Sequence, residues 1–118
     1  MENKNIEQTH FGYELYWSKN DNYGSKIIVF TKPEKTDFVY QIKTEKTWFV
    51  NEGEFSVRWI DTTDGKVYQQ KLSTGHVFET KVNTPYSLSC ESPAGTITES
   101  NNGYHEGDHY IAISRSIL

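Results

Sequence analysis

The stretch Tyr40-Gln-Ile-Lys-Thr-Glu-Lys-Thr-Trp-Phe-Val-Asn-Glu-Gly53 decides the fold of this 118-residue chain. Its second half, from Trp48 to Gly53, is an apolar segment that ends at a glycine, which is typical of a strand running into a tight turn. A second piece of this kind follows, in which Gly75-His-Val-Phe-Glu79 leads to Pro85-Tyr-Ser-Leu88. This half of the chain therefore predicts strands with short, glycine-containing connections.

Composition extends that prediction to the whole chain. A chain of 118 residues forms one domain with one core. Aromatic residues make up 14% of it, and no long stretch shows helical periodicity. Residues 55–59 alternate instead, with Phe55, Val57 and Trp59 on one face and Ser56 and Arg58 on the other. We expect an all-β protein.

About ten short strands are expected between Phe11 and the C-terminus, which is typical of a sandwich or barrel. One turn is specific enough to assign: Asp64-Gly65, between Trp59-Ile60 and Val67-Tyr68, suits a two-residue type I′ hairpin in which both positions have positive φ. Residues 1–10 are polar and are expected to form an N-terminal arm before a domain spanning residues 11–118. The expected strands are Tyr13–Trp17, Lys26–Thr31, Phe38–Ile42, Thr47–Val50, Glu54–Ile60, Val67–Tyr68, Tyr86–Cys90, Thr96–Ser100 and Tyr110–Ile113.

Charge and hydropathy exclude several classes of partner. The net charge is −4 and the basic residues are scattered, which argues against nucleic acid. No apolar run is long enough for a membrane span, and the polar N-terminus is unlike a signal peptide. Cys90 is the only cysteine, so no internal disulfide can form and a cytoplasmic location is expected.

The two strand-and-turn pieces resemble the two motifs of the cupin superfamily, and most closely those of the small cupin domain of mannose-6-phosphate isomerases. The resemblance runs from about Phe11 to Arg115. It implies a single cupin-type, jelly-roll β-barrel of two antiparallel sheets. Further matching pieces lie in the same order as in that family: Trp17, Tyr23-Gly-Ser-Lys-Ile27, Ile97-Thr-Glu-Ser100, Gly103-Tyr104 and Glu106-Gly-Asp108.

The family's metal ligands are not retained. The resemblance places the two strand ligands on Val39 and Gln41, the carboxylate on Lys46, and the histidine of the second motif on Tyr86. A shift of one residue would bring Glu45 to the carboxylate position but would put Phe38 and Tyr40 at the strand positions. Neither alignment supplies two imidazoles, so we expect no metal and no other cofactor.

Those same positions give the candidate ligand site, which consists of Gln41, Lys46, Trp48, Tyr86 and Tyr40. If Lys46 points into the barrel, its ammonium would suit an anionic sugar or a small carboxylate, although a solvated position at the rim is the alternative. Aromatic walls with a few polar groups are typical of small-ligand pockets, although Trp48 and Tyr86 could equally belong to the core.

Other catalytic patterns are weak. His105-Glu-Gly-Asp-His109 matches the H-E-x-x-H pattern of zinc proteases, but that pattern requires a helix and here it contains Gly107 and precedes an expected strand. A loop site formed by His105, Asp108 and His109 is the remaining option. Cys90 has no evident catalytic partner and is typical of a small buried residue.

Three functions are compatible with this sequence. The first is a metal-independent cupin that binds a small molecule, such as a sugar or sugar phosphate, inside the barrel. The second is a sugar isomerase or epimerase of the mannose-6-phosphate type. The third is a structural dimer with a filled barrel. The resemblance also implies a homodimer, with residues 1–12 and the last strand as its contacts.

Overall fold

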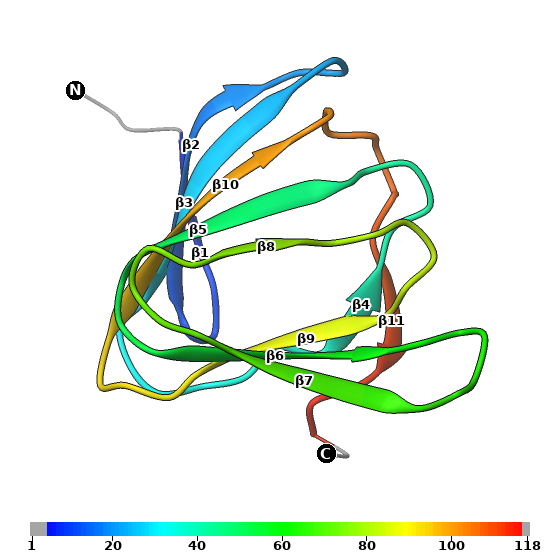
Figure 1. Cartoon of the computed structure of the whole chain (residues 1–118). Coiled ribbons are helices and arrows are strands. Elements are labelled where there is room, and N and C mark those ends of the chain that lie inside the picture. The colour runs from blue at the N-terminus through cyan, green and yellow to red at the C-terminus, as the bar shows by residue number, and fades with distance from the viewer. Residues whose placement is uncertain (1–4, 117–118) are drawn as a thin grey trace.

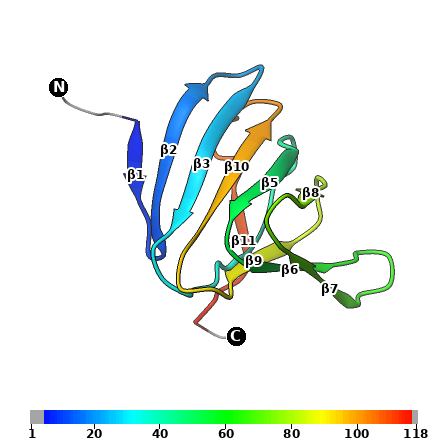
Figure 2. The same cartoon turned by 60° about the vertical axis from the view of Figure 1, so that its left-hand side comes forward.

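The computed structural model describes residues 5–116, which form two antiparallel sheets and contain no helix. The first sheet has the strand order β1-β2-β3-β10-β5-β8 and the second has the order β11-β4-β9-β6-β7. Figure 1 shows the two sheets facing each other, and Figure 2 shows the strands of the first sheet next to one another in the order β1, β2, β3, β10 and β5. The strands are β1 Ile6–Gln8, β2 Gly12–Lys19, β3 Gly24–Phe30, β4 Phe38–Tyr40, β5 Lys46–Glu52, β6 Phe55–Ile60, β7 Val67–Leu72, β8 Val77–Glu79, β9 Tyr86–Cys90, β10 Gly95–Asn101 and β11 Tyr110–Ile113. The predicted all-β, two-sheet architecture is confirmed.

Gly53 is the corner at which the chain leaves one sheet for the other, since β5 and β6 belong to different sheets. Its φ of 101° is disfavoured for any residue with a side chain. A Cβ here would also lie 2.8 Å from the carbonyl oxygen of Ala94. The glycine that ends the decisive stretch is therefore required twice, by its backbone conformation and by close packing.

The core lies between the sheets and follows from strand alternation. In β3, buried and half-buried residues alternate from Gly24 to Phe30, and β10 shows the same pattern from Gly95 to Glu99. Fully buried apolar side chains come from both sheets, because each sheet presents one face to the other. The largest of them are Phe30, Phe55, Leu72, Ile97, Val50 and Val57.

The hairpin between β6 and β7 exists, but the predicted turn type is wrong. Only Gly65 has a positive φ, of 72°, whereas Asp64 does not. The loop is longer than two residues: the Asp61 N–H donates to the Lys66 carbonyl at 2.9 Å, and the Gly65 N–H donates to the Asp61 carbonyl at 2.7 Å. Asp61 also accepts a hydrogen bond from the Thr63 N–H at 2.8 Å. These local bonds stabilise a longer connection, residues 61–66, in place of the tighter turn.

Of the predicted N-terminal arm, residues 1–4 lie outside the described residues. The remainder includes β1, which pairs with β2 through Ile6 opposite Leu15 and Gln8 opposite Tyr13. All three residues of β1 are exposed. This part of the predicted arm thus extends the first sheet. Residues 5–116 contain no helix with the length and hydropathy of a membrane span.

Candidate functional site

A cavity of about 480 Å³ lies between the two sheets. Its size falls within the range of about 300–1,000 Å³ that is typical of small-molecule sites. Both sheets contribute to its walls, and the segment between β10 and β11 adds Tyr104, His105, Gly107, Asp108 and His109. The lining residues include Glu14, Tyr16, Lys26, Ile28, Phe30, Thr36, Asp37, Val39, Gln41, Lys46, Trp48, Tyr86, Leu88, Glu99, Tyr104, Asp108 and His109.

The structure brings four of the five sequence-predicted site residues to this cavity. Gln41, Lys46, Trp48 and Tyr86 all line it, as does Val39. The fifth residue, Tyr40, is absent from the lining described for residues 5–116 and stacks on Tyr110 with ring centroids 5.1 Å apart. Side chains alternate along β4, so Tyr40 points away from the face that carries Val39.

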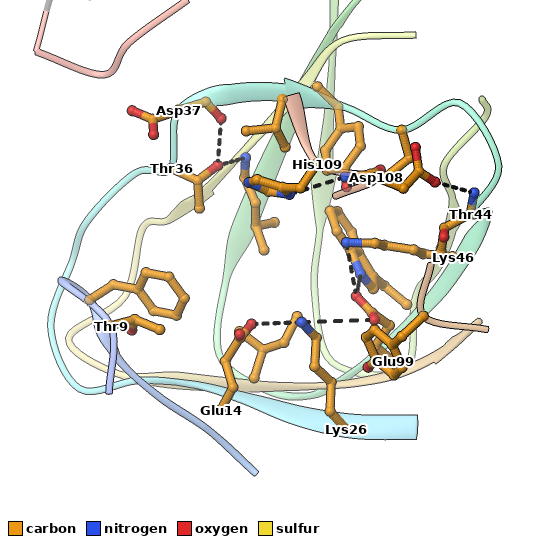
Figure 3. Close-up of a pocket in the computed structure, with 18 of the residues that line it drawn as sticks. Thr9, Glu14, Lys26, Thr36, Asp37, Thr44, Lys46, Glu99, Asp108 and His109 are labelled. Carbon is orange, nitrogen blue, oxygen red and sulfur yellow. Dashed lines mark hydrogen bonds and ion pairs between the residues drawn. The ribbon is translucent and has the colours of Figure 1, made fainter. Parts of the chain in front are cut away.

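A cluster of four charged side chains crosses one side of the cavity, as Figure 3 shows. Glu99 is fully buried and lies between two lysines, with Lys46 Nζ 3.8 Å from Oε1 and Lys26 Nζ 3.9 Å from Oε2. Lys26 also forms an ion pair with Glu14 at 3.0 Å. The Lys46 side chain is 13% exposed, so it is in the cavity and not on a solvated rim. Two positive and two negative charges are thus gathered in a site largely shielded from water.

Strand register assembles this cluster. Tyr16 on β2, Lys26 on β3, Glu99 on β10 and Trp48 on β5 are successive cross-strand partners. Cross-strand partners on one face have neighbouring side chains. Trp48 Nε1 accordingly donates to Glu99 Oε1 at 2.9 Å, and Asn101 Nδ2 donates to Oε2 at 2.9 Å.

The charges stabilise one another's ionised forms. Burial alone would raise the pKa of Glu99, but Lys46 and Lys26 outweigh it and hold that pKa below its ordinary value. Burial would lower the pKa of Lys46 and of Lys26, but Glu99 beside both and Glu14 beside Lys26 raise both pKa values above the ordinary one. Lys46 therefore remains an ammonium at neutral pH and is not suited to act as a nucleophile or base.

A second polar chain adjoins the charged cluster, because the Tyr86 hydroxyl contacts Lys46. The Tyr86 hydroxyl donates to Gln41 Oε1 at 2.8 Å, and Gln41 Nε2 contacts His109 Nδ1 at 3.4 Å. An amide nitrogen donates, so His109 Nδ1 accepts and its Nε2 carries the proton. Burial, with Lys46 and Lys26 nearby, lowers the pKa of His109. His109 is thus a neutral imidazole at neutral pH.

The segment with the H-E-x-x-H pattern is a turn, as the sequence indicated, and not a helix. Its Asp108 accepts the backbone N–H groups of Ile42, Lys43 and Thr44 at 2.7–3.0 Å. Asp108 therefore stabilises the connection between β4 and β5 and is not positioned as a metal ligand. Among residues 5–116, no three or more His, Cys, Asp or Glu side chains are grouped so that they could hold a metal ion.

One polar atom in the cavity wall is unsatisfied. The Tyr104 hydroxyl is buried, and although the Asn101 side chain lies beside its oxygen, no residue of the described chain accepts its hydrogen. Burial, with Glu99 nearby, raises the pKa of this phenol, so it stays protonated and can donate. A buried hydroxyl whose hydrogen has no acceptor is uncommon in folded proteins, and at a cavity wall it points to a group supplied from outside.

Sequence reasoning missed Glu14, Lys26, Tyr104 and His109 as cavity residues. A signal for Lys26 was present, because Lys26, Ile28 and Phe30 share one face of a strand whose even positions are buried. Glu99 shares a face with Ile97 in the same way. Tyr104 and His109 lie outside strands, where no periodicity could place them.

No protein-family model matches this sequence, and no curated protein matches it. Solved structures do match the fold. The capsular polysaccharide assembling protein CapF from Staphylococcus aureus superposes with a TM-score of 0.80 at 12% identity, over 90% of this chain and 31% of CapF. Oxalate decarboxylase from Bacillus subtilis gives 0.77 at 13% identity, over 91% of this chain and 29% of that protein.

A third match is Peruvianin-I, described as a cysteine peptidase from Thevetia peruviana latex, with a TM-score of 0.69 at 18% identity, over 79% of this chain and 57% of that one. This chain thus spans about a third of the length of CapF and of the decarboxylase. These likenesses establish the cupin fold. They do not extend to an activity, and the finer likeness to mannose-6-phosphate isomerases stays a prediction.

Proposed function

We propose that this cupin-fold barrel binds a small organic molecule, of the sugar or sugar phosphate class, in its interior and without a metal ion. The observation that carries the proposal is the cavity of about 480 Å³ with an ionised, mutually compensated cluster in its wall. Buried charges are costly to maintain, and a barrel that served only as a scaffold would be expected to fill its centre with apolar side chains. The reading as a structural dimer with a filled barrel is therefore less well supported.

The absence of a metal requirement rests on the residues at the ligand positions. Gln41, Lys46 and Tyr86 supply an amide, an ammonium and a phenol, and an ammonium repels a divalent cation. We expect chelated protein, shown by elemental analysis to hold no stoichiometric transition metal, to bind a hexose or hexose phosphate in calorimetric titration. Addition of Zn, Fe, Mn or Ni should leave the affinity unchanged. One metal ion per chain that is lost on replacing Gln41 or Tyr86 would contradict the proposal.

His109 favours a second candidate function, the isomerisation or epimerisation of a sugar. Such a reaction removes a proton from a carbon beside a carbonyl and returns it to a neighbouring carbon or to the opposite face. The base needs a pKa near neutrality and an unprotonated ring nitrogen, and the neutral His109 offers Nε2 in the tautomer whose Nδ1–H donates to the Gln41 side chain with its amide turned over. If the protein is an enzyme of this kind, His109→Gln should lower kcat by about 10²-fold or more while the sugar still binds. Exchange of the substrate's α-proton with deuterated water gives the readout, and wild-type protein without any exchange would exclude this candidate.

A further inference from the structure

We propose that the ligand of this cavity is an amphipathic anion: a carboxylate or phosphate group bound by Lys46 and Tyr104, attached to an apolar ring or chain that packs on Ile28, Phe30 and Leu88. This inference rests on one part of the proposed function, the binding of a small organic molecule inside the barrel, and it puts an amphipathic anion in place of the sugar. It goes further by requiring an anionic group and an apolar body.

Two side chains of the cavity have a donor that is not used. The Tyr104 hydroxyl is buried, and no acceptor for its hydrogen lies within residues 5–116. The Lys46 ammonium has three N–H groups, whereas its contacts in the described chain are Glu99 at 3.8 Å and the Tyr86 hydroxyl. At least one of its N–H groups is therefore open to a ligand. Tyr104 and Lys46 thus both present donors to the same cavity. The matching groups on a ligand are acceptor oxygens, which carboxylates and phosphates supply.

Of the two ammonium groups in the cavity, Lys46 has the weaker contacts with carboxylates. Lys26 has two carboxylate partners, Glu14 and Glu99. Among the described residues, Lys46 has only Glu99, which it shares with Lys26. The two other acidic side chains of the lining are already engaged. Asp37 accepts the Arg115 N–H at 2.7 Å, and Asp108 accepts three backbone N–H groups. Lys46 is thus the cation with the least compensation.

The apolar part of the cavity begins one step along the same strands. On β3 the inward residues are Lys26, then Ile28, then Phe30, and on β9 they are Tyr86, then Leu88. Each step of two residues advances about 6.5 Å. Phe11 stacks on Phe30 with ring centroids 4.1 Å apart and widens this apolar wall. A ligand with an anionic head and an apolar ring would span both regions, while a molecule with hydroxyls on every face would leave some of them unpaired.

Four probes that share a cyclohexane ring test this inference by calorimetric titration of the full chain: cyclohexanecarboxylate, cyclohexyl phosphate, cyclohexanecarboxamide and cyclohexylamine. We expect at least one anion to bind ten times or more tightly than the amide, and the amine not to bind. The ratio between the two anions shows whether the site prefers a carboxylate or a phosphate. An amide or amine that binds as tightly as both anions would overturn the inference.

The variant Tyr104→Phe is the sharpest probe, because it removes a hydroxyl whose hydrogen has no acceptor among the described residues. We expect it to weaken anion binding roughly tenfold without lowering the melting temperature. Tyr110→Phe is the matched control, since Tyr110 stacks on Tyr40 away from the cavity lining, and its affinity should equal that of wild type. Equal affinities of Tyr104→Phe and wild type for the anion would overturn the inference.

Failure of this inference can be distinguished from failure of the proposed function. If a neutral hexose binds in the cavity, while both anions bind no better than the amide, the barrel is a ligand-binding protein and the anionic head is wrong. If neither the four probes nor hexoses and hexose phosphates bind, both proposals fail and the structural dimer becomes the better account.

Discussion

Replacing Glu99 with Gln is expected to lower the free energy of unfolding by about 3–5 kcal/mol, although the two side chains have nearly the same shape. Glu99 is fully buried and is the carboxylate that lies between Lys26 and Lys46. The amide would keep an oxygen for Trp48 Nε1 but would leave Lys46 without a counter-charge in the described chain. An uncompensated buried ammonium costs more than the pair contributes, which is why removing one partner has a large effect.

Urea denaturation of wild type, Glu99→Gln and the control Glu52→Gln measures this effect. Glu52 is an exposed residue of β5, so its replacement should change stability by less than about 0.5 kcal/mol. Adding Lys46→Met to Glu99→Gln should restore part of the loss, because it removes the stranded charge. A Glu99→Gln protein as stable as Glu52→Gln would mean that the buried cluster does not carry the charges described here.

The same substitution has a defined pH dependence. The folded-state pKa of Glu99 lies below the ordinary value of 4.5, so the ionised carboxylate stabilises the fold above that value. That stabilisation is lost as the pH falls through the folded-state pKa. The difference in stability between wild type and Glu99→Gln should therefore be constant near neutrality and shrink in acid below about pH 4.5.

The apolar core residues and the polar cavity residues of the barrel could be predicted from sequence to different extents. Strand alternation correctly placed Phe55 and Val57 in the core, because a strand between two layers has one buried face. The resemblance placed Gln41, Lys46 and Tyr86 at ligand positions, and these three do line one cavity. The resemblance did not explain why residue 46 is a lysine. The explanation is its buried partner Glu99, which lies on another strand, 53 residues away in the sequence.

The features that escaped prediction depend on hydrogen bonds made by particular aspartates, one between distant segments and one within a loop. Asp108 looked like a weak metal ligand, but it accepts the backbone N–H groups of residues 42–44 and so fixes the connection that precedes Lys46. The Asp64-Gly65 pair suited a two-residue turn on its own terms, yet hydrogen bonds from Asp61 stabilise a longer loop. In both cases the deciding interaction comes from an Asp side chain, and pattern alone did not identify its partners.

Gly103 links the fold to the site, and its replacement by Ala is expected to lower the free energy of unfolding by about 3 kcal/mol or more. Its φ of 120° lies in a region that is open almost only to glycine. A Cβ would also collide with the backbone carbonyl of Asp21 in the connection between β2 and β3. The Gly103 carbonyl accepts the Thr44 hydroxyl at 3.0 Å, so this residue joins two connections that border the cavity.

Two other glycines separate the two causes of that effect, the backbone penalty at positive φ and the collision with Asp21. Gly65 and Gly107 have φ values of 72° and 75°, and a Cβ on either would meet nothing within 4 Å. Their replacement by Ala should cost only the backbone penalty, about 1 kcal/mol each by thermal or urea unfolding. If Gly103→Ala cost no more than these, the close approach to Asp21 would not be present in solution.

Gly103 also precedes Tyr104, whose N–H donates to the Asn20 carbonyl at 2.9 Å. If relief of the collision moves Tyr104, a Gly103→Ala protein that still folds should bind the anionic probe more weakly, whereas the variant at Gly65, which lies away from the cavity lining, should bind it as wild type does.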